Sequence, residues 1–162
     1  MSIDLHQRLA ELDLELPRVP TAVAQYVPAL RSGSHLFVSG QLPLREGELI
    51  ATGTVPSAVD LEQAIAAARQ CALNGLAAVD HVLEGDWSAF VRIARLAVFV
   101  ASDPDFHLQH KVANGASDLL GEVFGDAGKH ARAAVGVTAL PMGATVEVEL
   151  VVEVKHPGPP TA

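Results

Sequence analysis

One cation stands alone in an apolar segment near the C-terminus. Arg132 is the only charged residue of segment 131–138, which reads ARAAVGVT. If this segment forms a strand, Arg132 shares its face with an alanine and a glycine. A guanidinium among such small apolar neighbours needs an anionic partner to offset its desolvation. Two partners remain open: a structural ion pair with Glu147 or Glu149, which the alternation alone favours, or a substrate carboxylate held by two parallel hydrogen bonds.

Acidic residues alternate with apolar ones in the next such segment. Residues 145–154 read TVEVELVVEV, so Glu147, Glu149 and Glu153 share one face. The other face carries Val146, Val148, Leu150, Val152 and Val154. This pattern is typical of a strand with one solvated face. A carboxylate with apolar neighbours on that face would have a raised pKa and could transfer protons.

The other versatile side chains form no recognisable site. His107 and His110 lie three residues apart near a predicted helix start, but no cysteine or third ligand follows at a spacing typical of zinc sites. We therefore expect exposed histidines and no metal. Cys71 is the single cysteine and falls inside a predicted helix, where we expect a small buried residue rather than a nucleophile.

Helical periodicity marks two of the elements that would position these residues. Apolar residues over 2–14 predict a short helix with Ser2 as its N-cap. A long amphipathic helix is predicted over about 61–79. Ser57 would open it, with Asp60 three residues on in a pattern that resembles a capping box.

A further helix and five strands complete the predicted order. Asp103-Pro104 supplies an N-cap and a first-turn proline for a helix that ends near Gly125. Helices that flank single strands imply an α+β fold, a mixed sheet with both helices on one face. The predicted strands occupy residues 25–30, 35–39, 91–100, 131–138 and 145–154, with a loop or short irregular hairpin over 43–56.

Composition narrows the class of partner. The chain has 162 residues, 11 Lys and Arg, 4% aromatic residues and a net charge of −8, so it lacks the basic surface and stacking platforms that nucleic-acid binding requires. No stretch has the length of a membrane helix. No signal peptide is visible and one cysteine cannot form an internal disulfide, so we expect a cytoplasmic protein. The 49% hydrophobic content predicts a second buried surface, which self-association would supply.

Separate motifs resemble one known family. Residues 37–43, FVSGQLP, resemble the SGQ-(I/L)-P signature near the start of Rid (YjgF, reactive intermediate deaminase) proteins. Residues 130–149 resemble their C-terminal signature, in which an arginine strand leads through LP to a (V/I)E(V/I)E strand. The segments ARLAVFV at 94–100 and DF at 105–106 also fit. The resemblance spans about residues 24–154.

This resemblance implies a fold, an assembly and a reaction. Members have a chorismate-mutase-like fold and form trimers whose strands make an inner barrel, with ligand sites in the clefts between subunits. The best-known members hydrolyse reactive 2-imino or enamine acids to 2-keto acids and ammonia without a cofactor. Carried over by position, Arg132 would bind the substrate carboxylate and Glu147 would orient or activate the attacking water. The pocket would be lined by Tyr26, Ser39 and the backbone of Gly40, with Asn114 from a neighbouring subunit.

Some positions depart from the family pattern. Ala133 stands where serine is common and Ala134 where some active members have cysteine, so donors near the carboxylate are missing. This leaves open a noncatalytic trimer that binds a small carboxylate as a sensor or partner protein. His130 stands where proline is often found, and the spacing of Asn114 differs by about one residue from the usual pattern. A third interpretation of the function is endoribonuclease activity, after which some relatives are named. The acidic net charge argues against it.

The resemblance also divides the chain. We expect an N-terminal helical extension over 1–20, a Rid-like domain over 21–155 and a disordered tail over 156–162. No internal repeat or linker is evident in the sequence.

Overall fold

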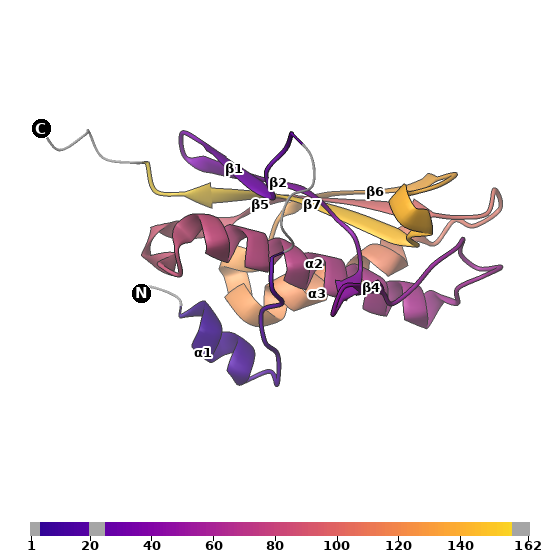
Figure 1. Cartoon of the computed structure of the whole chain (residues 1–162), viewed down its shortest axis with the longest axis horizontal. Helices are drawn as coiled ribbons and strands as arrows, with labels where there is room; N and C mark the ends of the chain where they lie inside the picture. Colours follow the sequence, from indigo (N-terminus) through magenta and orange to yellow (C-terminus); the bar gives the residue numbers. More distant parts are fainter. Residues whose placement is uncertain (1–3, 20–24, 157–162) are drawn as a thin grey trace, which may run out of the picture.

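A mixed β-sheet with two long helices on one face makes up the fold (Figure 1). The computed structural model describes residues 4–19 and 25–156. The predicted α+β class, with both helices on one face, is confirmed. Its helices are α1 (Leu5–Ala10), α2 (Leu61–Leu83) and α3 (Gln109–Phe124), with 3-10 turns η1 (Trp87–Ala89), η2 (Gly125–Gly128) and η3 (Pro141–Gly143). Its strands are β1 (Ala29–Ser32), β2 (His35–Gln41), β3 (Leu44–Arg45), β4 (Glu48–Leu49), β5 (Phe90–Ala101), β6 (Ala131–Val137) and β7 (Val146–Val154).

The main sheet has the strand order β1-β2-β7-β5-β6. Neighbouring strands are antiparallel except β5 and β6, which are parallel and joined through α3. β6 therefore lies at one edge of the sheet. β1 begins at Ala29 rather than at 25, since Pro28 has no N–H for a ladder. The irregular hairpin predicted over 43–56 contains the short pair β3 and β4.

The two faces of the sheet differ in what covers them. Val146, Val148, Leu150, Val152 and Val154 are all buried against the helices, as their alternation predicts. Among the described residues no helix covers the opposite face, which is the upper side of the sheet in Figure 1. Apolar side chains remain exposed there, at Leu30, Phe37 and Val135. The helices thus bury the apolar side chains of one face of the sheet, whereas apolar side chains on the other face remain exposed.

The N-cap of α2 lies three residues after the predicted one, although the helix begins at Leu61 as predicted. Asp60, not Ser57, is the N-cap: its side chain accepts from the backbone N–H of Gln63, and the Gln63 side chain accepts from the backbone N–H of Asp60. This is a capping box with Gln at its third position. Ser57 instead hydrogen-bonds Asp103.

α3 begins later than predicted. The sequence placed its N-cap at Asp103, but the helix starts at Gln109. The Asp103 carboxylate accepts hydrogen bonds from the hydroxyls of Thr54, at 2.7 Å, and Ser57, at 3.1 Å. Asp103 therefore ties the loop after β5 to the loop before α2. Because its carboxylate is engaged by these donors, it does not cap α3.

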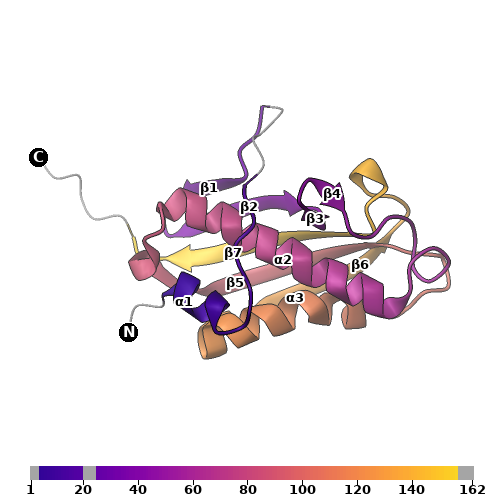
Figure 2. The same cartoon turned by 60° about the horizontal axis from the view of Figure 1, so that its bottom comes forward.

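The N-terminal segment packs outside the helices as a third layer (Figure 2). α1 is shorter than the predicted span 2–14, and Asp4 caps it by accepting from the Gln7 N–H at 3.0 Å. Ser2, the predicted cap, lies outside the described residues. Leu5 and Leu9 are fully buried in the same core as α2 and α3. Of the predicted tail 156–162, only His156 is described.

Within the described ranges, no helix combines the length and the apolar content needed to cross a bilayer.

Candidate functional site

Arg132 lies on edge strand β6 and points to the helix side of the sheet. The parallel register pairs Arg132 with Leu96 of β5, which is fully buried beneath the helices, so the two side chains share a face. Arg132 Nη1 donates to Asn114 Oδ1 at 2.9 Å and to Ser117 Oγ at 3.0 Å. Nη2 donates to the backbone carbonyl of His110 at 3.4 Å. Three groups of α3 therefore orient the exposed guanidinium.

All of these acceptors are neutral. No carboxylate lies within ion-pair distance of Arg132 among the residues that the structure describes. The interpretation as an ion pair with Glu147 or Glu149 is wrong, because both glutamates pair with β5 residues of the opposite face, Phe99 and Ala97. Alternation along the chain placed Arg132 correctly among small residues, but it could not say which face the helices cover.

Ser117 and His130 extend the hydrogen bonds of Arg132. Ser117 Oγ lies 3.0 Å from His130 Nε2, and His130 Nδ1 lies 2.6 Å from the carbonyl oxygen of Gly128. A cavity of about 320 Å³ opens beside these groups, lined by Ser117, Gly121, Gly128, Lys129, His130 and Arg132. Sequence reasoning noted His130 as unusual but missed Ser117, since the two are brought together only by the return of the chain from α3 to β6.

Glu147 lies on the helix-free face and is half-buried. It pairs across the sheet with Phe99. Burial raises the pKa of the Glu147 carboxyl above its ordinary value, and the negative charge of Glu149 raises it further. A raised pKa suits a carboxyl that transfers protons near neutral pH.

Gly40 leaves the space that the Glu147 carboxylate occupies. A Cβ at Gly40 would overlap Glu147 Oε1 and would lie 2.8 Å from its Cδ. This contact joins β2, which carries the SGQ motif, to the acidic strand β7. Gly40 and Glu147, predicted as separate parts of one pocket, are therefore in direct contact.

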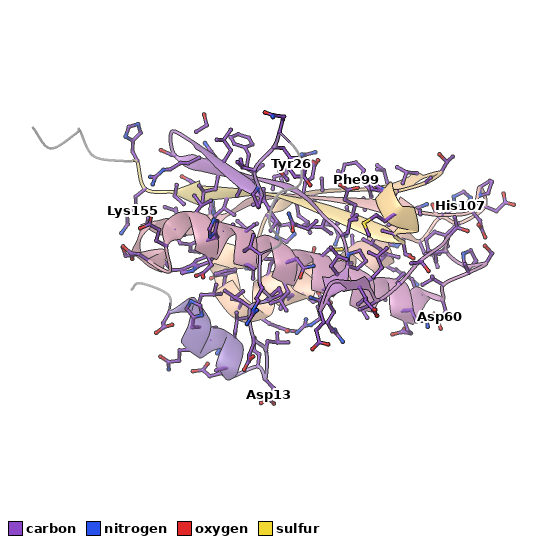
Figure 3. The ribbon with its side chains drawn as sticks, viewed as in Figure 1. Asp13, Tyr26, Asp60, Phe99, His107 and Lys155 are labelled. Carbon is purple, nitrogen blue, oxygen red and sulfur yellow. The ribbon has the colours of Figure 1, made fainter. Side chains whose placement is uncertain are left out.

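Tyr26 and Ser39 line a larger cavity of about 550 Å³. Tyr26 is 57% exposed, and Ser39 Oγ donates to the carbonyl of Val27 at 2.7 Å. Figure 3 shows Tyr26 and Phe99 on the side of the sheet away from the helices. The charged residues of this cavity are Arg95 and Glu149; Glu147 is not among its lining residues.

The predicted site residues thus form two groups. Arg132 and Asn114 meet on the helix side, within one chain, whereas the resemblance implied that Asn114 comes from a neighbouring subunit. Tyr26, Ser39, Gly40 and Glu147 lie towards the other face of the sheet. A single chain does not bring the two groups together.

Neither His107 nor Cys71 belongs to a metal site in the part of the chain that the structure describes, where no group of three potential ligands occurs. His107 and His110 are exposed. Cys71 is fully buried, and burial raises the pKa of its thiol well above the ordinary value, with the charge of Glu147 adding to the effect. Such a thiol is protonated near neutral pH and is a poor nucleophile.

Comparison with known proteins places this architecture. The family model described as "YjgF/chorismate mutase-like, putative endoribonuclease" matches residues 6–154. This match begins inside the segment 1–20 that the sequence analysis treated as an extension.

Individual relatives agree with the family match. Protein TCP17 of Trypanosoma cruzi is 43% identical over 91% of this chain and 92% of its own. The structure of Atu1372, a protein of unknown function from Agrobacterium tumefaciens, has 46% identity and a TM-score of 0.85, covering 93% of this chain and 92% of that one. TdcF of E. coli, solved with bound serine, has 26% identity and a TM-score of 0.58, covering 84% of this chain and 93% of its own. The chain belongs to the YjgF/Rid family, with its chorismate-mutase-like fold.

Proposed function

We propose that this protein hydrolyses reactive 2-imino or enamine acids to 2-keto acids and ammonia. One observation carries the proposal: Arg132 is oriented by neutral acceptors only and keeps its positive charge available at the edge of the sheet. A guanidinium in this state is suited to a carboxylate, which it can hold by two parallel hydrogen bonds.

The reaction asks little more of the protein. A 2-imino acid is already electrophilic at its imine carbon and hydrolyses in water, so an enzyme need only hold the carboxylate, position a water molecule and assist proton transfer. Glu147 is suited to the last two tasks because its raised pKa allows it to accept a proton from water and return it to the departing nitrogen. No cofactor takes part in this scheme.

The predicted site residues are divided between two faces of the sheet, which supports a site shared between subunits of an oligomer. Arg132 of one subunit and Glu147 of another would meet if the helix-free face of one sheet packed near the β6 edge of the next. The exposed Leu30, Phe37 and Val135 give that face an apolar surface to bury. A homotrimer, with cyclic symmetry, would repeat this contact at each subunit boundary.

A noncatalytic trimer that binds a small carboxylate is the second candidate. Ala133 and Ala134 follow Arg132 on β6 and supply no side-chain donor to a reacting group. The relative solved with bound serine, an amino acid with a free carboxylate, supports ligand capture equally well. Ligand binding without turnover would favour this candidate.

The family description mentions endoribonuclease activity, which we do not propose for this chain. Its net charge of −8 opposes approach to a polyanion. RNA cleavage by protein that is free of contaminating nucleases, and its loss in Arg132→Ala, would overturn this exclusion.

The proposal is tested by generating imines in situ with an amino-acid oxidase and following their loss with semicarbazide as a trap. We expect wild type to accelerate hydrolysis and Arg132→Ala to lose the acceleration. Arg92→Ala is the matched control, because Arg92 is also exposed but lies on β5, away from both groups. Equal turnover by wild type and Arg132→Ala would refute the role of Arg132.

A further inference from the structure

Beside Arg132, Ser117 and His130 form a chain of hydrogen bonds that the proposed reaction does not use. It runs from Arg132 Nη1 to Ser117 Oγ at 3.0 Å, then to His130 Nε2 at 3.0 Å. It ends at the Gly128 carbonyl, 2.6 Å from His130 Nδ1. Ser117 and His130 are both partly buried.

The two ends of this chain determine where its protons lie. The Gly128 carbonyl can only accept, so His130 Nδ1 carries a hydrogen. In a neutral imidazole Nε2 is then an acceptor, and the Ser117 hydroxyl must donate to it. Arg132 can only donate, so Ser117 accepts from it at the same time. With His130 neutral, the hydroxyl proton of Ser117 therefore points away from any ligand of Arg132.

We infer that Ser117 and His130 are a second, proton-linked arm of the anion site: binding of a carboxylate at Arg132 draws a proton onto His130 and turns the Ser117 hydroxyl towards the carboxylate. This inference rests on the proposed role of Arg132 as carboxylate anchor, and it adds a third donor that the proposed function lacks.

The proton balance of the step is simple. One proton from solvent adds to His130 Nε2, and no covalent bond between heavy atoms changes. Nε2–H then donates to Ser117 Oγ, which still accepts from Arg132, so the hydroxyl hydrogen is released from its bond to the imidazole. It can donate into the cavity of about 320 Å³ that Ser117, His130 and Arg132 line. A carboxylate there meets the guanidinium, the hydroxyl and a second positive charge.

The surrounding charges explain why His130 takes up a proton only when a carboxylate is bound. Arg132 and Lys129 also line the cavity and oppose a positive charge on His130, although Lys129 is paired with Asp126 at 2.7 Å. On α3, Glu122 is engaged by Arg69 at 2.6 Å. The remaining charged groups on that helix are His110, Lys111 and Asp118, none of which lines the cavity. A bound carboxylate adds the negative charge that offsets this repulsion.

The coupling of proton uptake to anion binding determines whether the affinity rises or falls with pH. If the anion-bound protein holds one more proton than the free protein, affinity rises as the pH falls, by at most about tenfold per pH unit. Where the pH is too high for His130 to take up the proton, the extra affinity is lost and Arg132 binds the carboxylate alone.

Calorimetric titration with pyruvate, a stable 2-keto acid, tests the inference between pH 5.5 and 8. Two buffers of different ionisation enthalpy at each pH report the protons taken up. We expect wild type to bind more tightly at low pH with net proton uptake. His130→Asn should bind with nearly constant affinity, and Ser117→Ala should lose most of the gain at low pH. His107→Asn, a control at an exposed histidine, should keep the wild-type profile.

The outcomes separate this inference from the proposed function. Pyruvate binding that depends on Arg132 but takes up no proton, or a His130→Asn profile equal to that of wild type, overturns the inference alone. Proton-linked binding without imine hydrolysis overturns the proposed function alone, and absence of binding at every pH overturns both. Nitrogen NMR of the histidine rings needs no ligand: neutral His130 should carry its proton on Nδ1, and a proton on Nε2 would contradict the arrangement.

Discussion

Gly115 marks a close approach of α3 to α2. A Cβ on Gly115 would overlap the carbonyl oxygen of Ile65 and lie 2.9 Å from its carbonyl carbon. The obstacle is helix backbone, which cannot rotate aside as a side chain can. Gly115→Ala should therefore push the two helices apart. Because Asn114 and Ser117 lie on the same turn of α3, the displacement should also reach the groups that orient Arg132.

The size of the effect follows from two opposing terms. Overpacking of a tight interior site costs about 1 to 3 kcal/mol, with backbone obstacles at the upper end, while replacing Gly by Ala inside a helix gains about 1 kcal/mol. Gly121→Ala is the matched control, because Gly121 lies on the same helix and an added Cβ there meets nothing within 4 Å. We expect Gly115→Ala to lose about 2 kcal/mol and Gly121→Ala to gain up to about 1 kcal/mol.

Urea unfolding of both variants and wild type measures this difference. All three should be compared at one protein concentration, since self-association would make stability depend on it. We expect the two alanine variants to differ by about 3 kcal/mol, because both gain helix propensity and only Gly115→Ala incurs the overpacking term. Equal stability of Gly115→Ala and Gly121→Ala would refute the packing of α3 on α2.

Three further substitutions test individual groups. The raised pKa of Glu147 means that the folded state holds its proton more tightly than the unfolded state. Wild type should therefore lose stability relative to Glu147→Gln as the pH rises above 4.5. A difference in thermal melting that does not vary with pH would contradict this. Asn74 is buried and donates to two backbone carbonyls, at 2.9 and 3.0 Å, so Asn74→Ala should lower the free energy of unfolding by about 1 to 3 kcal/mol in urea, and a loss near zero would argue against those bonds. Hydrogen bonds from Thr54 and Ser57 lower the pKa of Asp103. Wild type should therefore be more thermally stable than Asp103→Ala at neutral pH, and this difference should shrink as the pH falls below 3.8. A difference that persists in acid would show that the carboxylate charge is not involved.

The sequence predicted most elements because their local signals agree with their surroundings. β7 alternates outward and inward residues with Val151 as its one apolar outward position, and all its inward residues are buried. α2 has a long apolar stripe, and most of its core-facing residues are small or aliphatic. The capping residues were misassigned where a competing tertiary contact exists, as at Asp103, whose carboxylate is engaged across the fold by Thr54.

The site was only partly predictable for a different reason. Arg132 and Glu147 could be named from their strands, but the side of the sheet that each faces depends on the register of β5 with β6 and β7. No periodicity of a single strand contains that register. Ser117 lies on α3 and His130 lies 13 positions later, in the loop between η2 and β6, so their contact arises only from the turn at η2.

The central claim is that hydrolysis occurs at a site that two subunits share, with Arg132 from one and Glu147 from another. The most direct measurement is complementation: Arg132→Ala and Glu147→Gln, each expected to be inactive in the imine-trapping assay, are unfolded together in equal amounts and refolded. In a cyclic trimer with random mixing, about a quarter of the sites would receive both intact residues, so the account predicts recovery of about a quarter of wild-type activity. A mixture as inactive as either variant refolded alone would contradict the shared site.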